Sequence, residues 1–197
     1  MDQSIANLAL DLIDTRSTLG VTGVAAIART LARFGAPALT YASRHGVRVV
    51  PLLRNQRYAQ ASAALQRLGV DVDSWPAPPA GLFVVEERCM YLRSRSAMTV
   101  AHEFGHALDC ALGGGVYRSS VDPALRRLFA DARAFVTPYA ATGLDEYFAE
   151  SLRAYVEAND PQSFWPRATR ERLRRVDAPM FGYVERLFAC DFLAAIA

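Results

Sequence analysis

A chain of 197 residues, 52% of them hydrophobic, can bury one sizeable core but is short for two ordinary domains, so we expect one domain over residues 1–197. The formal net charge of +2 gives no indication of a nucleic-acid or membrane partner, and we expect neither. The three cysteines lack C-x-x-C spacing and indicate neither a disulfide framework nor a cysteine zinc site, which fits a reducing compartment.

Residues 1–45 carry apolar side chains at helical spacing, punctuated by glycines, and predict two or three helices. The most apolar part, residues 19–34, is interrupted by Arg29 and Arg33, and no basic region precedes it. The sequence therefore predicts neither a signal peptide nor a membrane span, and the chain as given reads as cytoplasmic. This interpretation leaves export as an effector or toxin open.

A short β-branched run at 47–53 predicts a strand, and residues 58–68 return to helical spacing before Gly69. The proline-rich stretch 74–81 is expected to be a connecting loop. Two short apolar runs, 82–85 and 89–92, flank a charged turn and predict a hairpin. Residues 1–96 are thus expected to form N-terminal helices and a small sheet.

From residue 97 to residue 197 the pattern is helical. The expected helices cover residues 97–112, 123–135, 144–158, 168–176 and 180–195. The glycine run 113–115 either ends a helix or forms a mobile lid hinge. The arginine-rich stretch 167–175 is expected to be a solvated helix face, and the last helix is expected to close the core.

The strongest chemical signal is the segment His102-Glu103-Phe104-Gly105-His106. Positions i and i+4 share a helix face, so both histidines can direct a ring nitrogen at one metal ion. Glu103 points about 100° round the helix from His102, where it can reach a metal-bound water without being an equal ligand. Alternatively, the two histidines are packing residues, although two of the three histidines in the chain fall in this apolar helix.

A catalytic zinc ion uses three protein ligands and lowers the pKa of a bound water, which Glu103 would deprotonate as general base. The expected cofactor is one Zn²⁺ per chain. Candidates for the third ligand lie in the expected helix 144–158, where Glu146 and Glu150 are one turn apart among apolar neighbours. One carboxylate can bind zinc while the other accepts the N–H of a ligand imidazole, unless both are simply solvated.

Three segments together resemble a known family. They are His-Glu-Phe-Gly-His-Ala-Leu-Asp (102–109), Pro-Tyr-Ala-Ala-Thr (138–142) and Asp-Glu-Tyr-Phe-Ala-Glu (145–150). In residue type, order and spacing these segments resemble the anthrax lethal factor and Pro-Pro endopeptidase family of zinc metallopeptidases. They are similar also to the Mlc titration factor peptidases.

The resemblance implies roles for particular residues. In that group a glutamate on the later helix is the third zinc ligand, and a tyrosine seven residues before it faces the metal-bound water. Glu146 matches this ligand, and Tyr139, seven residues earlier, matches the tyrosine as an oxyanion donor. Glu150 matches an acid that accepts from a ligand histidine, and Asp109 matches a motif acid of less certain role. The alternative for Tyr139 is a buried aromatic side chain in the loop between two helices.

The resulting expectation is an α+β, mostly helical zincin-like domain with a small sheet and hairpin next to the motif helix. The expected activity is hydrolysis of peptide bonds in a selected protein or peptide substrate by a zinc endopeptidase. The resemblance also implies that an exposed strand edge binds the substrate backbone. The alternative from another class is a zinc-containing regulatory or effector protein that acts by binding a partner. Substrate preference and oligomeric state do not follow from the sequence.

Overall fold

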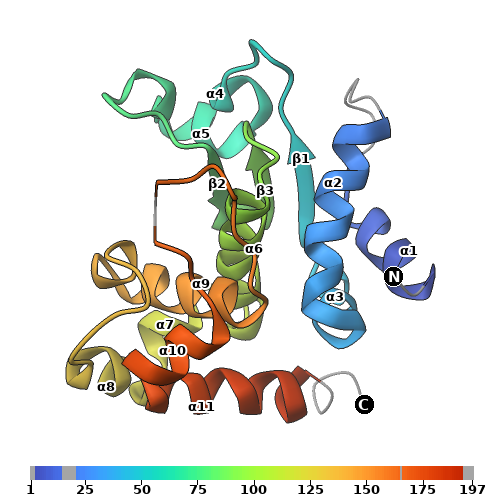
Figure 1. Cartoon of the computed structure of the whole chain (residues 1–197). Helices are drawn as coiled ribbons and strands as arrows, with labels where there is room; N and C mark the ends of the chain where they lie inside the picture. Colours follow the sequence, from blue (N-terminus) through green and yellow to red (C-terminus); the bar gives the residue numbers. More distant parts are fainter. Residues whose placement is uncertain (1–2, 15–20, 165, 193–197) are drawn as a thin grey trace.

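The structure is a computed structural model that describes residues 3–14, 21–164 and 166–192. Most of these residues are helical, and the helices surround a single small sheet (Figure 1). The predicted α+β class, with the sheet beside the motif helix, is confirmed. In the part of the chain that the structure describes, no helix is long and apolar enough to cross a bilayer.

The sheet has three strands in the order β1-β3-β2. Its strands are β1 (Arg48–Pro51), β2 (Gly81–Val84) and β3 (Cys89–Leu92). β2 and β3 form the expected antiparallel hairpin through the 3-10 turn η3 (Val85–Glu87), which Arg88 closes with a φ of 49°. β1 lies on the other side of β3 and runs parallel to it, while Ile13 bridges to Val49 beyond it. β2 is therefore left at the opposite edge of the sheet.

Three helices precede β1, at the upper limit of the prediction. They are α1 (Gln3–Asp11), α2 (Val21–Leu31) and α3 (Gly35–Arg44), with the 3-10 turn η1 (Ala32–Phe34) between the last two. Figure 1 shows them on the β1 side of the molecule. Phe34 packs edge-on against Phe104, with ring centroids 4.8 Å apart, so these helices support the back of the motif helix. His45, at the end of α3, hydrogen-bonds to Tyr41 O through Nδ1.

The helix expected over residues 58–68 is two helices, α4 (Tyr58–Ala61) and α5 (Ala63–Leu68). Ser62 separates them because its backbone is extended and its hydroxyl accepts a hydrogen bond from Leu65 N, which caps α5. Gly69 ends α5 in the left-handed conformation, as predicted. After the 3-10 turn η2 (Val72–Ser74), the proline-rich loop connects to β2 and is fixed where Tyr58 OH donates to Pro79 O.

The motif helix α6 (Ala97–Leu112) has the predicted bounds, and the Ser96 hydroxyl caps it by accepting from Thr99 N. Almost all of α6 is buried, and α9 (Leu144–Tyr155) crosses it (Figure 1). The two backbones meet at Gly105, where an added Cβ would lie 2.8 Å from Ala149 Cα. The glycine inside the histidine motif thus permits the close approach that brings α9 to the two histidines.

The remaining elements pack mainly against α9 and its neighbours. They are α7 (Arg118–Val121), α8 (Pro123–Asp131), η4 (Tyr139–Ala141), α10 (Arg170–Val176), α11 (Ala178–Arg186) and the π-helical turn η5 (Leu187–Asp191). α8 and α9 end earlier than predicted, α10 begins two residues later than predicted, and residues 193–195 of the last expected helix lie outside the described residues. α8 stops early because the chain turns to pack Phe135 against Phe129 and Tyr147. As expected, Val184, Leu187 and Phe192 at the C-terminal end close the core.

α7 was not predicted, because four residues are too few to show helical spacing. The glycine run 113–115 ends α6 and reverses the chain towards α7, with Gly114 and Gly115 at φ 70° and 109°. An added Cβ on Gly113 would lie 2.0 Å from Val116 O, so the turn requires glycine there. The run therefore serves as the helix terminator.

Replacing Gly105 with Ala should lower the stability of the metal-free protein. Alanine favours a helix by about 1 kcal/mol over glycine, but overpacking costs about 1–3 kcal/mol, so we expect a net loss of up to about 2 kcal/mol. Gly182 in α11 is the matched control, because an added Cβ there meets only the Arg186 side chain, at 3.6 Å. Gly182→Ala should stabilise by up to about 1 kcal/mol. Urea unfolding measures both, and equal stabilisation would contradict the close packing of α6 on α9.

Candidate metal centre and active site

His102 and His106 lie on one face of α6, and Glu146 in the first turn of α9 completes the group. The two histidine Nε2 atoms are 3.1 Å apart, and Glu146 Oε2 lies 3.1 Å from the first and 3.5 Å from the second. Burial opposes ionisation of Glu146, but the two histidine rings, which lie within 3.5 Å of its Oε2, outweigh this effect and lower its pKa. The predicted third ligand is thus brought to the two histidines.

These atoms fit a metal ion. Glu146 Oε2 is buried and has no hydrogen-bond partner among the described residues. An unpaired buried carboxylate oxygen is costly unless something else binds it. Two imidazole nitrogens and one carboxylate oxygen, all within 4.8 Å of one another, are a donor set that zinc uses in catalytic sites with three protein ligands.

Glu103 lies beside this group and against the sheet edge. Its carboxylate lies beside the backbone of Phe83 in β2, and the residue is 7% exposed. A Cβ added to Gly81 would lie 2.6 Å from Glu103 Cγ, so the first residue of β2 must be small for Glu103 to fit. Burial raises the pKa of Glu103, while the nearby histidine charges oppose the rise. A carboxyl group with a raised pKa is suited to exchange protons near neutral pH.

Glu150, one turn after Glu146, lies behind His102. Its Oε1 is 3.0 Å from His102 Nδ1, and a carboxylate there fixes the tautomer so that Nε2 presents its lone pair. Burial would raise the pKa of Glu150, but hydrogen bonds from His102 and Arg153 outweigh it and lower the pKa to about 2. The carboxylate is therefore ionised and ready to accept the imidazole N–H.

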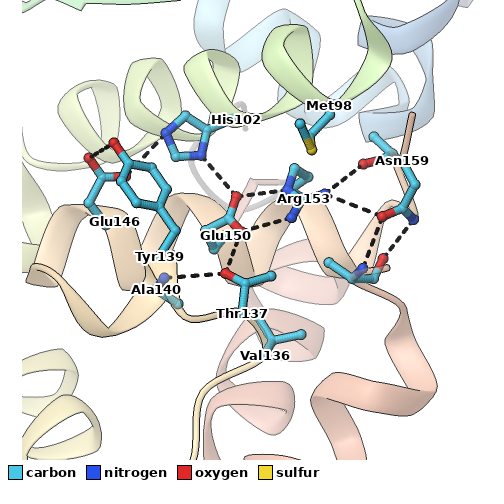
Figure 2. Close-up of polar contacts among 12 residues, drawn as sticks. Met98, His102, Val136, Thr137, Tyr139, Ala140, Glu146, Glu150, Arg153 and Asn159 are labelled. Atoms are coloured by element: carbon cyan, nitrogen blue, oxygen red, sulfur yellow. Dashed lines mark hydrogen bonds and ion pairs between the residues drawn. The ribbon is translucent and has the colours of Figure 1, made fainter. Parts of the chain in front are cut away.

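Tyr139 lies at the start of η4, over the metal group. Its ring centroid is 5.4 Å from that of His102, and its hydroxyl donates to Glu146 Oε1 at 3.0 Å (Figure 2). The side chain is 41% exposed, in contrast to the buried histidines, so it borders the open side of the site. Partial burial and the adjacent Glu146 carboxylate raise its pKa, so the phenol keeps its proton and remains a hydrogen-bond donor.

Asp109, the motif acid of less certain role, is fully buried one turn after His106. Its two oxygens accept from Ser119 N at 2.8 Å and from Ser119 Oγ at 2.5 Å, which ties α7 to α6. Burial raises the pKa of Asp109 to about 6. His106 Nδ1 is buried without a hydrogen-bond partner among the described residues, so Asp109 does not hydrogen-bond to this ligand imidazole in the structure.

Two cavities that share lining residues lie at the metal group, and all three ligands line one of them. One, of about 230 Å³, reaches Met98 and Arg153, and the other, of about 240 Å³, reaches Trp75, Tyr117 and Asp145. The edge residue Gly81, His102, Glu103 and Tyr139 border both cavities. The metal group therefore lies in a cleft that follows the outer edge of the sheet.

Three residues of the site were not predicted from the sequence: Tyr117, Thr137 and Arg153. The Tyr117 ring packs at a tilt against the His106 ring, with centroids 5.7 Å apart, after the glycine turn has reversed the chain. Thr137 and Arg153 both hydrogen-bond to Glu150. Arg153 carried a usable signal, because it is spaced i+3 from Glu150 on the buried face of an expected helix.

No family model matches the sequence, and no curated protein matches it. Solved structures do match. One is the Pro-Pro endopeptidase PPEP-2 from Paenibacillus alvei, which is 18% identical and has a TM-score of 0.66. The match covers 91% of this chain and 99% of that chain. The two proteins share a fold over nearly their whole lengths.

Proposed function

We propose that this protein is a zinc-dependent endopeptidase, with zinc held by His102, His106 and Glu146. The observation that carries the proposal is the convergence of these three ligands in a cleft that also contains Glu103 and Tyr139. The Pro-Pro endopeptidase whose fold is shared supports a peptide substrate. Neither observation depends on the other.

When bound at this site, zinc would supply a Lewis acid that polarises a carbonyl group and makes a water molecule acidic enough to attack near neutral pH. Glu103 would accept a proton from the attacking water on a carboxylate oxygen and then deliver it to the nitrogen of the leaving amine. Its raised pKa and its contact with the edge of β2 support this role, because they hold a proton-exchanging group beside the cleft.

Tyr139 would donate a hydrogen bond to the oxygen that becomes negative during attack. In the structure its hydroxyl donates to Glu146 Oε1, so a rotation of the side chain must exchange one acceptor for the other. The exposure of Tyr139 supports such a rotation. Glu146 would then have both oxygens available.

The shape of the cleft favours endopeptidase over carboxypeptidase activity. The two cavities share Gly81, His102, Glu103 and Tyr139, so a bound chain can continue from one cavity into the other. Of the described residues that line them, Arg153 is the one arginine or lysine, and its guanidinium is paired with Glu150. Among the described residues that line the cleft, no free cation is thus placed to bind a terminal carboxylate. The edge of β2 offers backbone groups for an extended peptide.

The test is cleavage-site profiling with a library of peptides blocked at both ends. We expect internal cleavage that a chelator abolishes and a stoichiometric amount of zinc restores. Cleavage confined to unblocked termini would refute the endopeptidase assignment. The absence of cleavage by the zinc-loaded protein over a diverse library would refute the peptidase assignment itself.

A further inference from the structure

Arg153 is a charged side chain that the proposed chemistry leaves without a role. It lies in α9 three residues after Glu150 and is 1% exposed. Its Nε donates to Glu150 Oε1 at 2.7 Å and its Nη2 donates to Glu150 Oε2 at 2.8 Å, which is the bidentate geometry of a strong pair. Burying an arginine in this way is costly unless every group is well paired.

The hydrogen bonds of Glu150 are complete. Oε1 accepts from His102 Nδ1 and Arg153 Nε, while Oε2 accepts from Arg153 Nη2 and from Thr137 Oγ1 at 2.5 Å (Figure 2). A carboxylate offers about four lone-pair sites, and all four are used. Glu150 is therefore held in one orientation and has no lone pair left for a metal ion.

The same carboxylate also holds the turn that carries Tyr139. The buried Thr137 hydroxyl donates to Glu150 and accepts from Ala140 N at 3.2 Å, within η4. His102 thus hydrogen-bonds to one oxygen of Glu150, and Thr137, which holds the turn that carries Tyr139, hydrogen-bonds to the other. Any rotation of that anion would move both.

Arg153 is in turn fixed from the other side. Its Nη1 donates to Ala158 O at 3.2 Å and to Asn159 Oδ1 at 3.3 Å. Asn159 pairs with the backbone of Ala168 in both directions, which ties the segment after α9 to the guanidinium (Figure 2). Arg153 borders the cavity that reaches Met98, but its burial and pairing leave little of it for a substrate to contact.

We propose that Arg153 is a positioning residue for the metal centre: it fixes Glu150, which orients His102 as a ligand and holds the Tyr139 turn. This inference rests on the proposed metal site. It requires that zinc affinity depend on Arg153 and that the dependence pass through Glu150. An arginine with a purely structural role would affect folding, but the zinc affinity would not depend on it through Glu150.

The experiment measures the zinc dissociation constant of purified protein by competition with a chromophoric chelator, without any peptidase assay. Arg153→Met should weaken zinc binding about 10- to 100-fold, the usual effect of losing an outer hydrogen-bond partner. Glu150→Gln should have an effect of similar size, and the double variant should be no weaker than the weaker single variant, because both act through one carboxylate. Arg33→Met, which removes a hydrogen bond to Glu157 O, is the matched control and should leave zinc binding unchanged.

Arg153→Lys keeps the charge but not the bidentate geometry, so it should recover part of the affinity. If Arg153→Met fails to fold, Arg153→Lys carries the test, with an expected loss of several-fold. The proposal is overturned if the folded Arg153 variants bind zinc like the parent protein, or if the losses of the two single variants add in the double variant. If the protein shows these zinc affinities but cuts no peptide, the proposed function is refuted, whereas the positioning role of Arg153 is not.

Discussion

Replacing Glu103 with Gln is expected to lower kcat/KM for any cleaved peptide by about 10³-fold, while one zinc ion per chain remains bound. The magnitude is that of a positioned general base, and it corresponds to about 4 kcal/mol of transition-state stabilisation. Zinc should stay because Glu103 does not belong to the group formed by His102, His106 and Glu146. The measurements are peptide hydrolysis rates and metal content of the same preparation.

The variant should keep its fold. Gln has nearly the shape of Glu, so it should fit the same space beside the backbone of Phe83. Burial raises the pKa of Glu103, which means that the folded protein disfavours the ionised form. A neutral amide removes this cost above the ordinary carboxyl pKa, so near pH 7 the melting temperature should be equal or higher.

The control is Glu171→Gln, the same change at an exposed position in α10, which should leave cleavage unaltered. This pair of variants also separates the two classes of function considered from the sequence. A protein that uses zinc only to maintain a partner-binding shape needs no base beside an open coordination position. Parent-like cleavage by Glu103→Gln would rule out the role of Glu103 in hydrolysis.

Local spacing was sufficient to predict the first half of the site. His102 and His106 share a face because a helix repeats every 3.6 residues, and α6 has the predicted bounds. The choice of Glu146 over Glu150 needed more, because both lie on one face of α9 and spacing alone does not distinguish them. The resemblance, with Tyr139 seven residues before Glu146, supplied that choice, and the structure places Tyr139 against Glu146.

The pairing of the strands and the other residues of the site depend on contacts between segments that are distant in the sequence. The periodic spacing of apolar residues carries no information about such contacts. The parallel pairing of β1 with β3 joins residues about 40 apart in the sequence. Tyr117 reaches His106 only because the glycine turn reverses the chain, and Thr137 reaches Glu150 from the irregular segment before η4. The sequence shows a glycine at position 105 but not why it is needed there. The structure gives the reason, because α9 packs directly against Gly105.

The two carboxylates of α9 have different proposed roles, so replacing each of them should have a different effect on zinc binding. Glu146→Gln is expected to abolish stoichiometric zinc binding, whereas Glu150→Gln should weaken it only about 10- to 100-fold. Glu146 Oε2 lies 3.1 and 3.5 Å from the two Nε2 atoms and lacks a hydrogen-bond partner among the described residues. Both oxygens of Glu150 are already occupied by donors from three side chains.

The two variants form a matched pair, because each replaces one carboxylate with an amide on the same face of α9, four residues apart. Metal analysis after gel filtration, followed by zinc titration, measures the difference. Equal, modest losses would show that neither carboxylate is a ligand, and a reversed order would assign the third ligand to Glu150. The expected order follows from the hydrogen bonds: zinc requires an oxygen with a free lone pair, and Glu146 provides one where Glu150 does not.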